Sequence, residues 1–481
     1  MLDFVTNRGD LYNEFFETIR CFNDGMQSGI SVNLTYVKTS QITVRVRVED
    51  KIYKFVYENC NDSAPDKAAY MRHDIYVNKL SLYKALSDYF GVSLPWGSLT
   101  GVRPTRIARR ISNGLGTDKI AEIMEKDYCV SPEKAKIAAE IIEIQRKHVG
   151  DRMTVCADSD SVDKLVNLYV HVPFCPTRCS YCSFVSQGVE KQKWLIGPYV
   201  DALIEEIRLT KEIIEKHGQK IFSVYVGGGT PTVLDPDRLY RLLSAARVDG
   251  TEFTCEAGRP DTFGDEKLSA ISAAGVNRIS INPQTLHDVT LQKIGRSHTT
   301  EQFYKAYEMS QKYGLQKNVD LIAGLSGENT SDFKYTLDEI IKLSPENITV
   351  HTLCLKRGSE NSLSGGEYNP HTESMIDYSV SALSSGGYLP YYLYRQKQAL
   401  SNLENIGWCK DGFICVNNVT VMEEMLSVYA CGAGAIGKII PPNGKIARLA
   451  NPKDVVLYLD QFQERMNKKE IFYQNQFTLP R

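Results

Sequence analysis

The sequence lacks the long apolar stretches of a membrane protein. None of its segments reaches the run of about eighteen apolar residues that a spanning helix needs. The first ten residues, MLDFVTNRGD, carry acidic residues and no apolar run, so no secretory signal is predicted. The chain also has no large excess of positively or negatively charged residues. The 56 basic and 58 acidic residues give a formal net charge of −2, which excludes strong attraction to nucleic acid or to membrane surfaces. These absences predict a cytoplasmic protein without a nucleic acid partner.

Repeats and low-complexity tracts are also absent, and the twelve cysteines are irregularly spaced. In a chain expected to stay in the cytoplasm, such cysteines indicate metal binding or buried thiols, not a disulfide framework. The remaining composition, 42% apolar and 24% charged residues, is ordinary for a soluble globular protein. A length of 481 residues allows two or three domains.

Residues 1–160 are predicted to form an α+β domain of their own. Apolar and polar residues alternate between about 30 and 57, which predicts a hairpin with one wet face. Helices are expected at 66–92, 117–126 and 132–149. The polar residues 151–164 are typical of a linker.

Residues 161–355 change to an alternation of strands and helices. Apolar runs predict six buried strands at 166–172, 221–226, 252–256, 277–282, 317–323 and 347–353. Helices are expected between them, near 198–216, 236–246, 265–274, 299–313 and 331–343. This order predicts an α/β fold with an incomplete parallel (βα)6 barrel, whose chemistry lies at the carboxyl ends of the strands. Residues 356–481 are expected to form a C-terminal extension that closes the barrel mouth and the substrate site.

A cysteine-rich loop follows the first predicted barrel strand. It reads YVHVPFCPTRCSYCSF from Tyr169 to Phe184 and spaces Cys175, Cys179 and Cys182 as C-x3-C-x2-C. Three thiolates from one short loop can hold three irons of a cubane iron–sulfur cluster and leave the fourth iron open to another ligand. A zinc site with His171 as fourth ligand is the main alternative, although structural zinc usually takes its ligands as two separated pairs. The two other interpretations of this cysteine motif are thiols that bind nothing and a disulfide bond.

Polar residues mark the ends of the other predicted strands. Gly227-Gly228-Gly229-Thr230 follows the second strand, where missing side chains let the backbone approach a ligand, although a tight turn has the same letters. Glu256, Gln284, Arg296 and Asp320 lie on or after the next three strands. Buried polar groups need partners. They either pair among themselves or bind a ligand that bears an amino group, a carboxylate and ribose hydroxyls.

Basic residues form two further groups. One is expected to face the barrel mouth and comprises Arg259, Lys356, Arg357, Arg395 and Lys397. All of these except Lys356 are expected substrate contacts. The other, Arg103, Arg106, Arg109 and Arg110, is more typical of a solvated helix face than of an anion site.

Together these motifs resemble the radical S-adenosylmethionine (SAM) superfamily. LYVHVPFC, CSYCSF, GGGTPT, GVNRISINPQT and NVDLIAGL resemble the oxygen-independent coproporphyrinogen III oxidase family over about 165–355. LPWGSLTGVRPT, EAGRPDT and YYLYRQK are similar to its HemZ-type branch, named coproporphyrinogen dehydrogenase. The resemblance implies a [4Fe-4S] cluster on the three cysteines, with SAM on its open iron as the source of a 5′-deoxyadenosyl radical. It further implies haem biosynthesis: two propionates of coproporphyrinogen III become the vinyls of protoporphyrinogen IX.

The resemblance also implies residue roles and partners. A first SAM would contact Tyr169, Gly228, Glu256 and Ile436. A second SAM would contact Tyr181, Gly229, Thr230, Gln284, Arg296, Asp320 and Cys354, the last through its backbone. A tetrapyrrole substrate and a reductant such as flavodoxin or ferredoxin are the implied partners.

One position departs from the decarboxylating members of that family. They carry a fourth cysteine two positions after the cluster, where this chain has Phe184. CSF at 182–184 instead resembles the branch of haem chaperones, which share the core and do not decarboxylate. Three alternatives therefore stay open: a haem-binding chaperone or trafficking protein, a radical SAM methyltransferase that acts on haem, and a zinc-stabilised barrel that binds a nucleotide.

Overall fold

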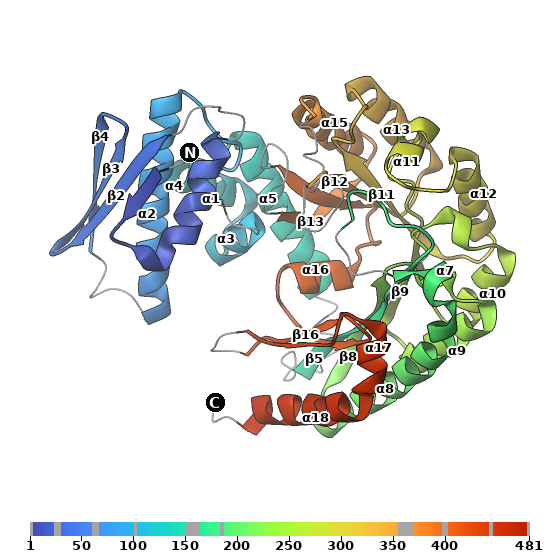
Figure 1. Cartoon of the computed structure of the whole chain (residues 1–481). Coiled ribbons are helices and arrows are strands. Elements are labelled where there is room, and N and C mark those ends of the chain that lie inside the picture. Colours follow the sequence, from blue (N-terminus) through green and yellow to red (C-terminus); the bar gives the residue numbers. More distant parts are fainter. Residues whose placement is uncertain are drawn as a thin grey trace. The chain divides into compact units, whose positions relative to one another are not determined.

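The computed structural model describes residues 3–23, 30–59, 67–100, 103–150, 153, 164–182, 187–354, 369–396, 403–441 and 446–478 (Figure 1). The chain divides into two compact units. Unit 1 comprises Met1–Glu143 and Ser401–Leu403, and unit 2 comprises Ile144–Leu400 and Glu404–Arg481. The three domains predicted at 1–160, 161–355 and 356–481 stay predictions, and most of the expected linker lies outside the described residues.

Unit 1 begins with a four-stranded sheet. Its strands are β1 (Asp3–Thr6), β2 (Ser31–Lys38), β3 (Gln41–Val48) and β4 (Lys51–Glu58), in the order β1-β2-β3-β4. Strands β2 to β4 pair antiparallel, so the predicted hairpin is a three-stranded meander, and β1 joins it in parallel. Alternation buries Val44 and Val46 while Arg45 stays exposed. Helix α1 (Tyr12–Asn23), which was not predicted, contributes to the core on this face.

Four further helices belong to this part of the chain. They are α2 (Lys67–Phe90), α3 (Pro104–Ile111), α4 (Thr117–Tyr128) and α5 (Pro132–Gln145). The predicted start of the last helix is confirmed, because the Lys134 backbone N–H donates to Ser131 Oγ at 3.4 Å. None of the helices in the described ranges is long and apolar enough to cross a membrane.

Unit 2 is built on an eleven-stranded sheet. Its centre consists of six parallel strands in sequence order: β5 (Leu165–Val172), β8 (Lys220–Gly228), β9 (Glu252–Glu256), β10 (Arg278–Ser280), β11 (Gln316–Ala323) and β12 (Asn347–Thr352). Each lies where an apolar run predicted it. Near-continuous burial explains this agreement, since a strand covered on both faces has no polar side.

Helices follow the strands as expected. They are α8 (Ile196–Lys216), α9 (Pro236–Ala246), α10 (Asp265–Ala273), α12 (Thr300–Gln311) and α13 (Thr330–Leu343), and Figure 1 shows them along the outer side of the curved sheet. The incomplete parallel (βα)6 barrel is therefore confirmed. Two short helices of this range, α7 (Val189–Gln192) and α11 (Asp288–Lys293), were not predicted.

The C-terminal segment completes the same sheet at both edges. Strands β13 (Leu389–Arg395) and β14 (Glu404–Cys409) extend it antiparallel beyond β12. On the other side, β15 (Ser427–Cys431) pairs parallel with β5 and is followed by β16 (Ile436–Ile439) and β17 (Ala447–Ala450). Helices α16 (Val416–Met422) and α18 (Phe462–Thr478) flank these strands in the sequence.

A buried ion pair secures the β15–β16 turn. Glu206 of α8 and Lys469 of α18 lie 2.9 Å apart (Oε1 to Nζ), and both are almost fully buried. Glu206 Oε2 also accepts hydrogen bonds from Tyr458 Oη and from the Gly432 backbone N–H, each at 2.7 Å. Burial would raise the pKa of Glu206, but Lys469 and the hydrogen-bond donors outweigh it and lower that pKa.

Candidate functional site

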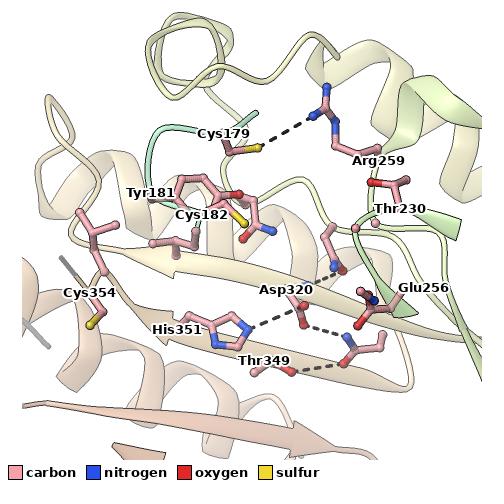
Figure 2. A pocket seen from close by; sticks show the side chains of 18 of the residues that line it. Cys179, Tyr181, Cys182, Thr230, Glu256, Arg259, Asp320, Thr349, His351 and Cys354 are labelled. Carbon is pink, nitrogen blue, oxygen red and sulfur yellow. Dashed lines mark hydrogen bonds and ion pairs between the residues drawn. The ribbon is translucent and has the colours of Figure 1, made fainter. Parts of the chain in front are cut away.

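The barrel encloses a cavity of about 330 Å³ in unit 2. All three cysteines of the C-x3-C-x2-C motif line it, together with residues that follow β8 and β9 and residues of β11, β12 and β13. Thirteen predicted site residues meet here: Cys175, Cys179, Tyr181, Cys182, Gly228, Gly229, Thr230, Glu256, Arg259, Gln284, Arg296, Asp320 and Cys354. Figure 2 shows the cysteine loop on one side of the cavity and Asp320, His351 and Thr349 on the other.

The cysteine loop is held by the barrel rim. The Ser180 backbone N–H donates to Ile294 O at 3.1 Å, and Thr177 Oγ1 donates to Gly295 O at 2.9 Å. Within the loop, the Cys182 N–H donates to Cys179 O at 3.1 Å. These contacts fix the loop over one end of the cavity, so its thiols face a common space.

A cation lies beside the thiols. Arg259 Nη1 is 3.9 Å from Cys179 Sγ (dashed in Figure 2) and 3.1 Å from Thr177 Oγ1. Its Nε and Nη2 donate to the two carboxylate oxygens of Asp261, each at 3.2 Å. Arg259, predicted as a substrate contact, therefore holds the cysteine loop, and its substrate role stays a prediction.

The cavity fits an iron–sulfur cluster better than a single metal ion. Among the described residues, no three His, Cys, Asp or Glu side chains converge as ligands of one ion. A cubane cluster does not need this, because each cysteine binds a different iron. His171, the expected fourth zinc ligand, is absent from the cavity lining, and its Nδ1 lies 2.9 Å from Tyr169 Oη.

Glycine is required at two positions of the GGGTPT segment. Gly228 has φ +113°, and a Cβ there would lie 2.6 Å from the His171 ring. A Cβ on Gly229 would lie 2.4 Å from Phe174 O. The Thr230 N–H then donates to that same oxygen at 2.8 Å. These glycines let the segment pack directly against the start of the cysteine loop.

Glu256 lies at the end of β9 in the cavity wall. Its Oε1 accepts a hydrogen bond from Tyr225 Oη at 2.6 Å, and its Oε2 accepts one from the Gly228 backbone N–H at 3.1 Å. No lysine or arginine in the described ranges forms an ion pair with it. Desolvation and the charge of Asp320 raise the pKa of Glu256 to about 7. The carboxylate therefore lacks a cation that a ligand could supply.

Arg296 and Gln284 also line the cavity. Arg296 Nη1 donates to Tyr181 Oη at 3.2 Å, and its Nη2 donates to Gly258 O and Asn282 O, each at 2.6 Å. Gln284 has φ +71°, unusual for a residue with a side chain. Its buried Oε1 has no hydrogen-bond partner within the described ranges. An unpaired buried acceptor in a cavity indicates a ligand donor.

Asp320 belongs to a polar network on the opposite wall. Asn318 Nδ2 donates to Asp320 Oδ1 at 2.8 Å, and His351 Nε2 lies 3.7 Å from Asp320 Oδ2. Burial would raise the pKa of Asp320, but His351 and Asn318 outweigh it and lower the pKa. Tyr394 Oη in turn lies 3.3 Å from His351 Nδ1.

The sequence analysis missed several lining residues of this network. They are Asn282, Asn318, Thr349, His351, Tyr392 and Tyr394. A signal for some of them exists: Thr349 and His351 are two residues apart in a predicted strand, as are Tyr392 and Tyr394 in the YYLYR segment. Side chains two apart share one face of a strand.

Two predicted SAM contacts, Tyr169 and Ile436, line a second hollow of about 410 Å³. Tyr225, Asn418 and Met422 line both spaces, so the second hollow borders the cysteine cavity. Arg395 lines neither. It is 2% exposed and follows Tyr394 directly, so the strand alternation turns it to the opposite face. Lys356, Arg357 and Lys397 lie outside the described residues.

Comparisons with known proteins agree with this geometry. A family model described as the Radical SAM superfamily matches residues 169–340. The oxygen-independent coproporphyrinogen-III oxidase-like protein HemZ of Bacillus subtilis is 36% identical over 408 residues, which cover 82% of this chain and 79% of that protein. The heme chaperone HemW of Lactococcus lactis is 32% identical over 282 residues, which cover 56% of this chain and 68% of that protein.

A solved structure shows the same fold. Coproporphyrinogen III oxidase (HemN) of Escherichia coli, described as a radical SAM enzyme, superposes with a TM-score of 0.51 at 21% identity. The superposition covers 63% of this chain and 70% of that one. At this identity the likeness supports the fold alone.

Proposed function

The chain belongs to the radical SAM superfamily, in the family of oxygen-independent coproporphyrinogen III oxidase-like proteins, and we propose that it is an oxidoreductase of tetrapyrroles. The proposed reaction converts two propionates of coproporphyrinogen III to vinyl groups and gives protoporphyrinogen IX. Each conversion removes one hydrogen atom from the propionate β-carbon, one electron and carbon dioxide. It therefore needs a hydrogen-atom acceptor and an external electron acceptor.

The similarity to HemZ carries this proposal. It extends over 408 residues, whereas the superfamily model matches only residues 169–340. The shared region thus includes segments outside the core that all radical SAM proteins have. The names of relatives described as anaerobic coproporphyrinogen III oxidases, such as that of Cereibacter sphaeroides, support the same substrate class.

The family implies a [4Fe-4S] cluster and SAM as cofactors. Cys175, Cys179 and Cys182 are the residues that would hold the cluster, and their shared cavity fits it. When bound, the cluster and SAM supply the hydrogen-atom acceptor as a carbon radical. Residues predicted to contact a first and a second SAM line this one cavity, and a second SAM stays a prediction.

The chain's own side chains prepare this cavity for SAM. Glu256 offers a carboxylate without a cation to an amino group, and Gln284 offers an unpaired acceptor. On the opposite wall, Asp320 can accept hydrogen bonds from hydroxyl groups. Arg296 ties Tyr181, next to Cys182, to the barrel, so the loop stays over the ligand. These residues therefore bind and orient the ligand.

An anaerobic turnover assay tests the proposal. The full chain is reconstituted with iron and sulfide, supplied with SAM, a strong reductant and coproporphyrinogen III, and its products are read by mass spectrometry. We expect protoporphyrinogen IX, or the intermediate with one vinyl group, together with 5′-deoxyadenosine. 5′-Deoxyadenosine with an intact tetrapyrrole would retain the radical chemistry and overturn the substrate.

The cysteine ligands are tested separately. Cys179→Ala should abolish the brown absorbance of the reconstituted cluster and all turnover, because the remaining thiols leave one iron without its ligand. Cys21→Ala is the matched control, since this thiol lies in unit 1 and should change neither readout. A full cluster in Cys179→Ala would contradict the ligand assignment.

A haem chaperone is the second candidate. Phe184 takes the place of the fourth cysteine of the decarboxylating members, and relatives from several bacteria are named heme chaperone HemW. This function predicts a stable haem complex, seen as a Soret absorbance band after gel filtration, with no change in coproporphyrinogen III. The turnover assay and the haem titration together distinguish the two candidates.

A further inference from the structure

Unit 1 has a hollow of its own, about 330 Å³ in volume. Seven residues line it: Lys79, Leu99, Arg103, Pro104, Arg106, Ile107 and Arg110. Four of them are cationic, and none of the described lining residues is a carboxylate. We refer to this space as the basic hollow. It contains three of the four arginines that the sequence suggested were a solvated helix face.

The spacing of these residues explains how they meet. Arg103, Arg106 and Arg110 recur at intervals of three and four along the start and length of α3, so they lie on one face of the helix. Lys79 comes from α2. Arg109, on the same helix, is not part of the lining. The basic hollow is therefore built by side chains of two helices that converge on one space.

Like charges surround Arg110. Desolvation, followed by the charges of Arg72 and Arg106, lowers the pKa of Arg110. Arg110 has no ion-pair or hydrogen-bond partner within the described ranges. The whole chain has a net charge of −2, so general basicity does not account for such a cluster. An anion in the hollow would relieve the repulsion on Arg110.

The shape and the donors indicate the kind of anion. Guanidinium groups present paired N–H donors that match the oxygens of phosphate. Helix α3 starts at this site with Pro104, and Arg103 at its N-cap provides no side-chain cap, so the positive end of the helix dipole adds to the attraction. Leu99, Pro104 and Ile107 give one apolar wall. A space of this size exceeds one phosphate group and suits a ligand with an organic part.

We propose that the basic hollow of unit 1 binds a small molecule that carries a phosphate group. The cationic side chains hold the phosphate, and the apolar wall contacts the rest of the ligand. This site is independent of the proposed decarboxylation, because it involves neither the cysteine cavity nor its cofactors. It gives the N-terminal unit a ligand-binding role.

Isothermal titration of the full chain with inorganic pyrophosphate tests the proposal. Sodium chloride keeps the ionic strength constant, since screening weakens any exposed charge cluster. We expect one site per chain. The double variant Arg103→Gln/Arg106→Gln should weaken binding at least tenfold, and single variants should weaken it less.

The control removes the same charge elsewhere on unit 1. Arg45 and Arg47 are exposed on β3 and do not line the hollow, so Arg45→Gln/Arg47→Gln should bind pyrophosphate as the unchanged chain does. Circular dichroism confirms that each variant is folded. Equal weakening in both double variants, no pyrophosphate binding at constant ionic strength, or binding of long RNA alone would overturn the proposal.

Discussion

Two regions of unit 2 each place a glutamate away from bulk water, and they treat it differently. Around Glu206, between α8 and α18, a lysine, a tyrosine and a backbone N–H neutralise the carboxylate, and its pKa is lowered. Around Glu256, at the end of β9, one tyrosine and one backbone N–H are the donors, and its pKa is raised to about 7. The carboxylate of Glu206, which is paired with a cation and hydrogen-bond donors, stabilises the fold. An unsatisfied charge at a cavity wall marks a place for a ligand.

Removing the cation from the first region should have the largest effect. Lys469→Met leaves Glu206 buried without its counter-ion, so we expect the free energy of unfolding to fall by about 3–5 kcal/mol. Urea denaturation followed by circular dichroism measures this change.

The neighbouring lysine is the matched control. Lys468 is exposed on the same helix and pairs with Glu464 at the surface, so Lys468→Met should cost less than about 1 kcal/mol. Equal decreases in the free energy of unfolding of the two variants would show that the buried Glu206–Lys469 pair stabilises the fold no more than a surface pair does.

Neutralising the second region should affect binding and leave the fold intact. Glu256→Gln keeps the shape and one acceptor but removes the charge, so SAM affinity should fall about 10–100-fold, as for other charge-assisted contacts (about 1.5–3 kcal/mol). Equilibrium dialysis on the reconstituted protein measures the affinity. Unfolding free energy serves as the control, because the variant removes a poorly satisfied charge. A stability loss as large as that of Lys469→Met would contradict the comparison.

The barrel was predictable because its signals are local. Each central strand is a short apolar run, and Gly228 and the three cysteines stand in continuous motifs directly after strands. Polar residues inside those strands, such as Asp320, stood out because burial makes them costly. The candidate site could therefore be predicted from the sequence wherever a strand, its loop and the functional residue follow one another directly in the chain.

The parts that the sequence did not reveal depend on distant pairing. Strand β15 pairs with β5, although more than 250 residues separate Ser427 from its partner Val166. That pairing sets Ile436 and Tyr169 around a second hollow. The pairings of β13 with β14 and of β14 with β12 bring Tyr394 to His351. No local pattern encodes which edge of a sheet a later strand joins. Unit 1 shows a related limit, because β1 is only four residues long.

The smallest effects should appear in the pH dependence of SAM binding. Because the pKa of Glu256 is raised to about 7, the carboxyl is neutral below that pH and charged above it. An ionised carboxylate accepts a stronger hydrogen bond from the amino group of SAM than a neutral carboxyl does, so SAM affinity should rise up to about tenfold between pH 6 and 8, with a midpoint near 7. Glu256→Gln should show no such rise.

Tyr225→Phe sharpens this prediction. Tyr225 Oη donates to Glu256 Oε1 and stabilises the charged form, so its loss should move the midpoint of the affinity profile to higher pH. Tyr394→Phe is the control: this tyrosine lines the same cavity but contacts His351, so the midpoint should not move. Equal midpoints in all three proteins would assign the pH dependence to a group other than Glu256. Glu256 and Glu206 would then differ in their hydrogen-bond donors, and the difference between their pKa values would not be supported.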